Sequence, residues 1–278
     1  MNPFSLYELL PAVPTITIID IGAALAEKPN YDGLIKAGRA RLVGFEPNAA
    51  ECAKLNARYG EPHRFFPCFV GDGGEATFHE TNWTLTGSLY EPNTPLLEKF
   101  QALAEVVTPK AQHRIQTRRL DDIAEIDDAD LIKIDVQGAE LAVFRNASRL
   151  LGKALLVQTE VEFVEIYKNQ PLFADVDGHL RGAGFQFHGF AGFGARAFKP
   201  LLRDNNPYVG FRQMLWADVW YVRDWMRFDL LDEAKLMKFA VLLHDVVGSF
   251  DLCHLVLEEL ERRGAPGLAG RYRERLVQ

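Results

Sequence analysis

The stretch "IIDIGAALAEKPNYDGL", from Ile18 to Leu34, decides the fold class of this chain. It begins with β-branched residues, turns at Gly22 and continues with helical spacing, which is the pattern of a strand, a turn and a helix. A second such unit follows, because the apolar run "RLVGFEP" (Arg41 to Pro47) precedes a helical stretch at 48–59. Strands that alternate with helices in this way predict a parallel sheet.

The alternation continues through most of the chain and predicts seven strands in all. The runs at 130–135 ("DLIKID") and 154–163 ("ALLVQTEVEF") are almost continuously apolar, which is typical of central strands buried on both faces of a sheet. Between the third and fourth strands, "EATFHET" and "GSLYEPN" indicate a short hairpin or lid. The remaining strands are expected at 15–20, 41–47, 65–70, 185–190 and 218–222, and the helices at 31–38, 48–59, 95–105, 138–151 and 172–183.

The pattern changes at Trp225. From there, "LLDEAKLMKFAVLLHDVV" and "SFDLCHLVLEELERR" place apolar and charged residues at helical spacing. We therefore divide the chain into a main domain of residues 1–224 and a helical C-terminal appendage of residues 225–278. The apolar sides of these helices have to be buried, either on the main domain or in a homo-oligomer that forms through them.

The composition argues against several classes of protein. The 278 residues carry a formal net charge of -7, so the chain as a whole does not attract a nucleic acid. The three cysteines have neither the spacing of a zinc site nor that of a disulfide framework, which favours a cytoplasmic protein and indicates no metal. No run approaches the roughly 20 apolar residues that span a bilayer, so we expect a soluble protein with no membrane span.

Asp20 and Gly22 lie where open parallel sheets bind ligands, at the carboxyl end of the first strand and at the point where strand order reverses. A dinucleotide site needs G-x-G-x-x-G in this turn so that backbone amides can approach a pyrophosphate, and only Gly22 of these glycines is present. S-adenosylmethionine has no phosphate, so one glycine and several carboxylates suffice to bind it. The alternative is a polar strand end followed by an ordinary turn.

Two further carboxylates follow the next strands. Glu46 comes 24 residues after Gly22, close to the offset of about 20 residues at which an acidic side chain reaches ribose hydroxyls. Its alternative role is to favour the start of the following helix through the helix dipole. Asp72, in "VGDGG", falls where an adenine amine would lie, and its alternative role is that of a turn aspartate among glycines.

The stretch "LIKIDVQGAEL" (Leu131 to Leu141) is the most specific signal in the chain. Lys133 and Asp135 point to the same side of a strand that is otherwise apolar. Charged groups in a buried strand need partners or a function. This strand is therefore the centre of the predicted site.

Six motifs occur in one order along the chain: "IDIGA" (19–23), "GFEPN" (44–48), "VGDG" (70–73), "SLYEPN" (88–93), "TRRLDDI" (117–123) and "KIDVQGAE" (133–140). In these motifs, over about residues 15–190, the chain resembles the FkbM family of S-adenosylmethionine-dependent methyltransferases. The resemblance implies an α/β fold of the class I methyltransferase type, with a Rossmann-like, seven-stranded, mostly parallel sheet. It also implies methylation of a hydroxyl, often on a sugar or a glycosylated natural product. The chain departs from the family at Ala24 and Ala26, where asparagine and glycine are commoner.

The expected roles follow from the chemistry of methyl transfer. In-line transfer depends mostly on positioning, but a hydroxyl acceptor must also lose its proton. We expect Asp135 on the acceptor side of the methyl group, with Lys133 and Glu160 as the other catalytic residues. The alternatives for Glu160, together with Glu162, are a salt bridge to Lys133 or coordination of a divalent ion. S-adenosyl-L-methionine is expected to contact Asp20, Gly22, Ala23, Glu46, Pro47, Asp72, Ser88 and Asp135.

The acceptor is expected to be a small molecule or a glycan. The stretch 185–215 contains seven aromatic residues and has four basic residues against one acidic residue, which gives +3 in an acidic chain. This reversal of sign favours an anionic acceptor, such as a sugar that carries a phosphate or carboxylate. The alternative is a packed aromatic cover with solvated arginines.

Two other functions are compatible with the same sheet. A nicotinamide-dependent oxidoreductase would use a similar fold, although the turn after the first strand lacks its phosphate-binding glycines. A catalytically silent relative that serves as an interaction module is the other, because Ala24 and Ala26 depart from the family. Binding of S-adenosylmethionine would distinguish both from a methyltransferase.

Overall fold

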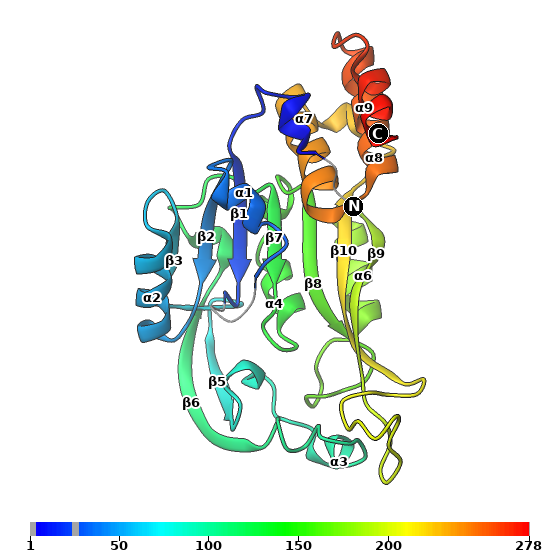
Figure 1. Ribbon diagram of the computed structural model, residues 1–278. Helices are drawn as coiled ribbons and strands as arrows, with labels where there is room; N and C mark the ends of the chain where they lie inside the picture. The colour runs from blue at the N-terminus through cyan, green and yellow to red at the C-terminus, as the bar shows by residue number, and fades with distance from the viewer. Residues whose placement is uncertain (1–3, 24–27, 278) are drawn as a thin grey trace.

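A computed structural model of the chain describes residues 4–23 and 28–277 (Figure 1). Within these residues, seven strands form the main sheet in the order β3-β2-β1-β7-β8-β10-β9. The first five are parallel, and β10 runs antiparallel to both β8 and β9. The expected seven-stranded, mostly parallel sheet is confirmed. Its strands are β1 (Ile16–Ile21), β2 (Ala40–Phe45), β3 (Arg64–Phe66), β7 (Leu131–Ile134), β8 (Leu156–Glu162), β9 (Phe185–Ala195) and β10 (Met214–Arg223).

A second sheet of three strands lies beyond the carboxyl ends of the parallel strands (Figure 1). It consists, among the described residues, of β4 (Phe69–Val70), β6 (Pro109–Arg118) and β5 (Glu75–Thr81), in that order. The strand expected at 65–70 is therefore divided between two sheets. Pro67 lies at the division, and a proline has no N–H to continue the hydrogen-bond ladder of the main sheet.

The hairpin expected from "EATFHET" and "GSLYEPN" is only partly correct. His79 and Ser88 form a single antiparallel bridge, but β5 pairs along its length with β6. The sequence did not indicate β6 as a strand because nearly all of its side chains are exposed. A strand without a buried face has no apolar alternation.

Short helices connect the strands of the main sheet. The 11-residue helix α2 (Ala49–Tyr59) begins at Asn48, whose side chain accepts hydrogen bonds from the amides of Ala50 and Glu51. The helix expected at 138–151 is broken into two, and the one expected at 95–105 is reduced to one turn. The other elements are α1 (Asp32–Lys36), α3 (Thr94–Leu97), α4 (Glu140–Arg145), α5 (Ser148–Leu151), α6 (Phe173–Gly182), and the 3-10 turns η1 (Leu6–Glu8), η2 (Thr84–Thr86), η3 (Leu120–Asp122) and η4 (Phe228–Leu230).

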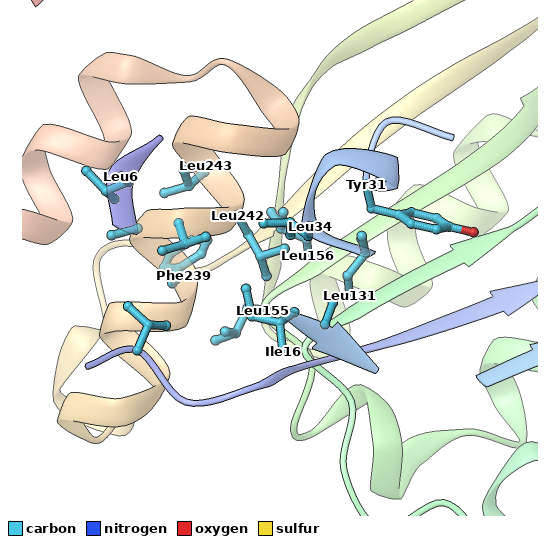
Figure 2. Close-up of a cluster of buried hydrophobic side chains, with 14 of the residues drawn as sticks. Leu6, Ile16, Tyr31, Leu34, Leu131, Leu155, Leu156, Phe239, Leu242 and Leu243 are labelled. Atoms are coloured by element: carbon cyan, nitrogen blue, oxygen red, sulfur yellow. The ribbon is translucent and has the colours of Figure 1, made fainter. Parts of the chain in front are cut away.

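The C-terminal helices cover one face of the sheet toward the amino ends of its parallel strands (Figure 1). They are α7 (Glu233–Val241), the π-helical turn η5 (Leu242–Val247), α8 (Phe250–Arg262) and α9 (Leu268–Leu276). Figure 2 shows Phe239 and Leu242 beside the strand residues Ile16 and Leu156, in one continuous apolar core. The expectation that the apolar sides of this segment are buried does not hold at Leu230 in η4 and Leu255 in α8, which are exposed.

Buried ion pairs fasten α7 to the sheet. The carboxylate of Asp130 is fully buried, and its two oxygens lie 2.6 Å from the Nζ of Lys235 and 2.7 Å from the Nζ of Lys238. The amide of Thr17 in β1 donates to the same carboxylate at 2.8 Å. The C-terminal helices are thus bound to the sheet by charge as well as by apolar packing.

The first described residues close onto the last helices. His244 Nε2 lies 2.9 Å from the carbonyl oxygen of Phe4, and Ser5 donates to Asp245 at 3.1 Å. Arg275 in α9 forms an ion pair with Glu8 in η1. Among the described residues, no helix is both long and apolar enough to cross a bilayer.

Candidate active site

The turns that follow the two central strands touch one another. Gly22 follows β1 with φ of 83°, and a Cβ at this position would lie 2.0 Å from the backbone oxygen of Asp135, the residue after β7. The amides of Gly22 and Ala23 both donate to the carbonyl of Phe45 at the end of β2, at 3.1 and 3.0 Å. The carboxyl ends of β1, β2 and β7 therefore meet at the point where strand order reverses. Ala24 and Ala26 lie outside the described residues.

Asp20 and Lys133 face each other on adjacent strands. Their side chains form an ion pair with 3.3 Å between Lys133 Nζ and Asp20 Oδ1. The hydroxyl of Tyr31 donates to the other carboxylate oxygen, and burial together with this negative charge raises the pKa of Tyr31. In Figure 2 the Tyr31 ring extends away from the C-terminal helices. These side chains, with Gln158 and Asp218, line a cavity of about 250 Å³, which we call the Asp20 cavity.

Glu46 lies directly after β2, and Pro47 follows it. One carboxylate oxygen of Glu46 accepts a hydrogen bond from the amide of Asn48 at 2.7 Å. Burial raises the pKa of Glu46. This hydrogen bond lies at the start of α2, as the alternative role of Glu46 at the start of the helix requires. Glu46 also lies at the same edge of the sheet as Gly22.

Asp72 and Ser88 belong to the segments beyond this edge. Asp72 follows β4 in the small sheet, and its Oδ1 accepts from the amide of Gly74 at 2.8 Å and from the hydroxyl of Thr117 at 3.2 Å. This is the geometry of a turn aspartate. Ser88 is buried, and its hydroxyl donates to the backbone carbonyl of Gln137 at 2.6 Å. The hydroxyl of Ser88 is therefore engaged by the protein in this structure.

A cluster of carboxylates lies at the ends of β7 and β8 and on the neighbouring helix α4. The side-chain amide of Gln137 donates to Asp135 Oδ1 at 2.7 Å and to Glu160 Oε2 at 2.9 Å. Burial and the surrounding negative charges raise the pKa values of Glu160 and Glu162. Burial also raises the pKa of Glu140 to about 7, although its Oε1 accepts from the amide of Val136 at 2.8 Å.

The sequence analysis did not assign Gln137 or its neighbour Tyr167 to the site. The Tyr167 hydroxyl lies 2.8 Å from the carbonyl oxygen of Thr86 and 3.2 Å from Gln137 Oε1. The sequence feature that could have indicated Gln137 is its position directly before Gly138 in "KIDVQGAE". No group of three or more histidine, cysteine, aspartate or glutamate side chains in the part of the chain described could hold a metal ion.

The residues just described coincide with the region that matches a known family. A model of the methyltransferase FkbM domain matches residues 20–187, which include Asp20, Glu46, Asp135 and Glu160. The chain belongs to this methyltransferase family. Asp20 and Glu160 lie in β1 and β8, whereas Glu46 and Asp135 come directly after β2 and β7.

Individual relatives of this FkbM methyltransferase give weaker comparisons. The chain is 33% identical over 153 residues to a 2-O-methyltransferase, NoeI, from Sinorhizobium fredii (strain NBRC 101917 / NGR234). The match covers 50% of this chain and 61% of that protein. A Thermoplasma acidophilum structure assigned as a methyltransferase is 7% identical, with 76% of this chain and 69% of that chain covered and a TM-score of 0.36. A Streptococcus pneumoniae structure assigned as a tRNA (m1A22) methyltransferase is 15% identical, with 98% and 97% covered and a TM-score of 0.36. Neither structural likeness supports a conclusion about this chain.

The aromatic, basic stretch of this FkbM methyltransferase is a strand followed by a packed loop. Arg196 donates to the carbonyls of Ala195 and Tyr208 and lies over the Trp216 ring. Arg203 donates to the carbonyl of Gly210 at 2.9 Å. These two arginines hold the loop together, whereas the side chain of Arg212 is exposed.

Proposed function

We propose that the protein is an S-adenosyl-L-methionine-dependent O-methyltransferase that acts on a hydroxyl of a sugar, glycan or glycosylated small molecule. The observation that carries the proposal is the meeting of the Gly22 and Asp135 turns, with Asp20 and Glu46 at the same sheet edge. Open parallel sheets bind their ligands at this edge. When bound, the cofactor supplies a methyl group on a positively charged sulfur.

The side chains at this edge fit the chemical groups of the cofactor. Asp20 Oδ1 is buried and accepts no hydrogen bond from the described residues, although Lys133 lies 3.3 Å away. In this proposal Asp20 would bind the ammonium group of the cofactor beside its ion pair with Lys133, and Lys133 would bind the cofactor's carboxylate. Glu46 presents a carboxylate that suits a ribose diol. The mixture of acids and one lysine matches a zwitterionic amino-acid end and a diol.

The acceptor side needs a group that takes a proton. Positioning the acceptor oxygen in line with the methyl group accounts for most of the rate in such a displacement. Asp135 holds a carboxylate at the end of β7, beside the Gly22 turn, and it would accept the hydroxyl proton. The relative named as a 2-O-methyltransferase supports a hydroxyl as the acceptor.

The three free cysteines favour a cytoplasmic setting.

Calorimetry with S-adenosylmethionine and its demethylated product tests the cofactor. Removing the Glu46 carboxylate in Glu46→Ala should weaken binding about 10- to 100-fold, because a hydrogen bond to a charged group contributes about 1.5 to 3 kcal/mol. Glu51→Ala is the matched control, since Glu51 lies in the first turn of α2 and forms an exposed ion pair with Lys54. Equal affinities of the wild type and Glu46→Ala would remove Glu46 from the site.

The same titration separates the competing functions. Binding of a nicotinamide dinucleotide in place of S-adenosylmethionine would favour an oxidoreductase. A folded protein that binds neither cofactor would favour an interaction module. A panel of sugar phosphates and neutral glycosides then tests whether the acceptor is anionic. In that case Arg212→Ala and Lys199→Ala should raise the KM for anionic acceptors without changing cofactor affinity, because these exposed side chains would contribute uniform binding.

A further inference from the structure

Gln137 connects two carboxylates that come from different elements. Asp135 follows β7 and Glu160 lies in β8, and the single amide nitrogen of Gln137 donates to both, at 2.7 and 2.9 Å. Both N–H groups of the amide are therefore used on carboxylate oxygens. Without this bridge, two acidic side chains would face each other with no donor between them.

Gln137 is itself held from two directions. Its backbone adopts φ of 56°, a conformation that few non-glycine residues adopt. The Ser88 hydroxyl donates to its carbonyl at 2.6 Å, and the Tyr167 hydroxyl lies 3.2 Å from its side-chain oxygen. Ser88 and Tyr167 are both buried. A strained backbone that its surroundings hold in place is common at functional sites.

The charges around this pair are predominantly negative. Glu160 is faced by Asp135, by Glu162 on its own strand, by Glu140 on α4 and by Asp218 on β10, and burial and these charges raise its pKa. Tyr167 also lies against this cluster. Lys133 on β7 forms its ion pair with Asp20. The two donors of Gln137 therefore act where a negative charge is most in need of stabilisation.

We propose that Gln137 is a positioning residue that holds Asp135 and Glu160 as one pair, from which Asp135 takes the acceptor proton. This inference rests on the proposed function. Asp135 takes the hydroxyl proton as the acceptor oxygen bonds to the methyl carbon and the methyl–sulfur bond breaks, with its electron pair left on a neutral sulfur. The positive charge of the sulfonium and the negative charge of the carboxylate would disappear together.

The test is the pH dependence of catalysis in Gln137→Met, which keeps an unbranched side chain of similar length and removes the amide. We expect kcat to fall about 10- to 100-fold with the KM for S-adenosylmethionine within about twofold, because a charged hydrogen bond is lost at the reacting centre. The acid limb of kcat/KM should move up by about one pH unit, since the carboxylate that takes the proton has lost a hydrogen-bond donor. Gln186→Met is the matched control, because Gln186 bonds to Arg181 outside the site.

A purely structural role for Gln137 would give a different result. It would lower kcat at all pH values and leave the acid limb where it is in the wild type, which would overturn the inference. Gln137→Ala serves as the second variant if Gln137→Met folds poorly, and its limb is expected to move in the same direction.

A measurement on the protein alone separates this inference from the proposed function. The carboxyl carbons of Asp135 and Glu160 can be followed by ¹³C NMR during a pH titration, without cofactor or acceptor. The midpoints belong to the pair, and Gln137→Met should move them to higher pH by about one unit. Unchanged midpoints would overturn the role of Gln137, whereas a wild type that binds no S-adenosylmethionine would overturn only the proposed function.

Discussion

The α-carbon of Gly22 lies directly against the backbone carbonyl of Asp135, so the turns after β1 and β7 leave no space for a side chain between them. This contact gives Gly22 a role that does not depend on any cofactor. It also fixes the distance between the turn expected to hold the cofactor and the carboxylate expected to receive the proton. A change at Gly22 should therefore affect both the stability of the protein and the geometry of its site.

Gly22→Ala should lower the free energy of unfolding by about 1 to 3 kcal/mol, because it combines an unfavourable φ of 83° with a Cβ 2.0 Å from the Asp135 oxygen. It should also weaken binding of S-adenosylmethionine. Gly38→Ala is the control, since Gly38 has φ of 65° but nothing lies within 4 Å of its added Cβ. Chemical denaturation of both variants measures the difference. Equal losses of stability in the two variants would show that the added methyl group of Gly22→Ala moves away from the Asp135 oxygen without a further loss of stability.

Asp130→Ala should destabilise the protein by about 1 to 3 kcal/mol, because the amide of Thr17 loses its acceptor while Lys235 and Lys238 keep Asp128 as an ion-pair partner. Asp127→Ala removes a nearby but exposed ion pair with Arg41 and should cost less than about 1 kcal/mol. Urea denaturation compares the two. A small loss in Asp130→Ala would mean that apolar packing alone holds α7 on the sheet.

Glu140→Gln should flatten the pH dependence of stability. The pKa of Glu140 rises from 4.5 to about 7 on folding, so the folded state binds more protons than the unfolded state in this range. Stability from this group is therefore greatest below pH 4.5, falls as the pH rises to about 7 and stays low above it. The loss is about 3 kcal/mol at most. Between these pH values, the free energy of unfolding should fall more steeply with pH in the wild type than in Glu140→Gln. Equal slopes would contradict the prediction.

Arg196→Ala should loosen the loop at 196–213. The guanidinium donates to two backbone carbonyls and lies over the rings of Tyr208 and Trp216, and its loss should cost about 1 to 3 kcal/mol. Limited proteolysis should then cleave this loop faster than in the wild type. Arg212→Ala, at an exposed side chain, is the control. Equal cleavage of both variants would place the stabilising contacts of the loop elsewhere.

The strands of the main sheet could be predicted because most are buried on both faces. The run "TITIID" (15–20) is rich in β-branched residues and "DLIKID" (130–135) is apolar between its charged residues, and the alternation of such runs with helices predicts parallel pairing. The small sheet was harder to predict. Its strand β6 is mostly polar, and β4 is two residues long after Pro67, so neither produces a clear periodic signal.

The candidate site could likewise be predicted only in part from the sequence. The residues at strand ends, such as Asp20, Glu46 and Asp135, follow from the position of their strands. The partners of these residues do not, because they depend on contacts between distant segments. Ser88, which bridges His79 of the small sheet, donates to the carbonyl of Gln137, and Gln137 in turn donates to Glu160 on the neighbouring strand β8. The sequence predicts that Ser88 contacts the cofactor, and the structure adds a hydrogen bond from its hydroxyl to the carbonyl of Gln137 that no sequence pattern indicates.

The position of the C-terminal helices has a consequence for how the chain is synthesised. The face of β1 that carries Ile16 and Ile18 is covered by α7 and α8, which leave the ribosome after every strand of the main sheet. Until they emerge, the nascent chain holds an uncovered apolar surface on its central strands. The core on this face can therefore form only after α7 and α8 have left the ribosome, and a chaperone would have to shield that surface until then.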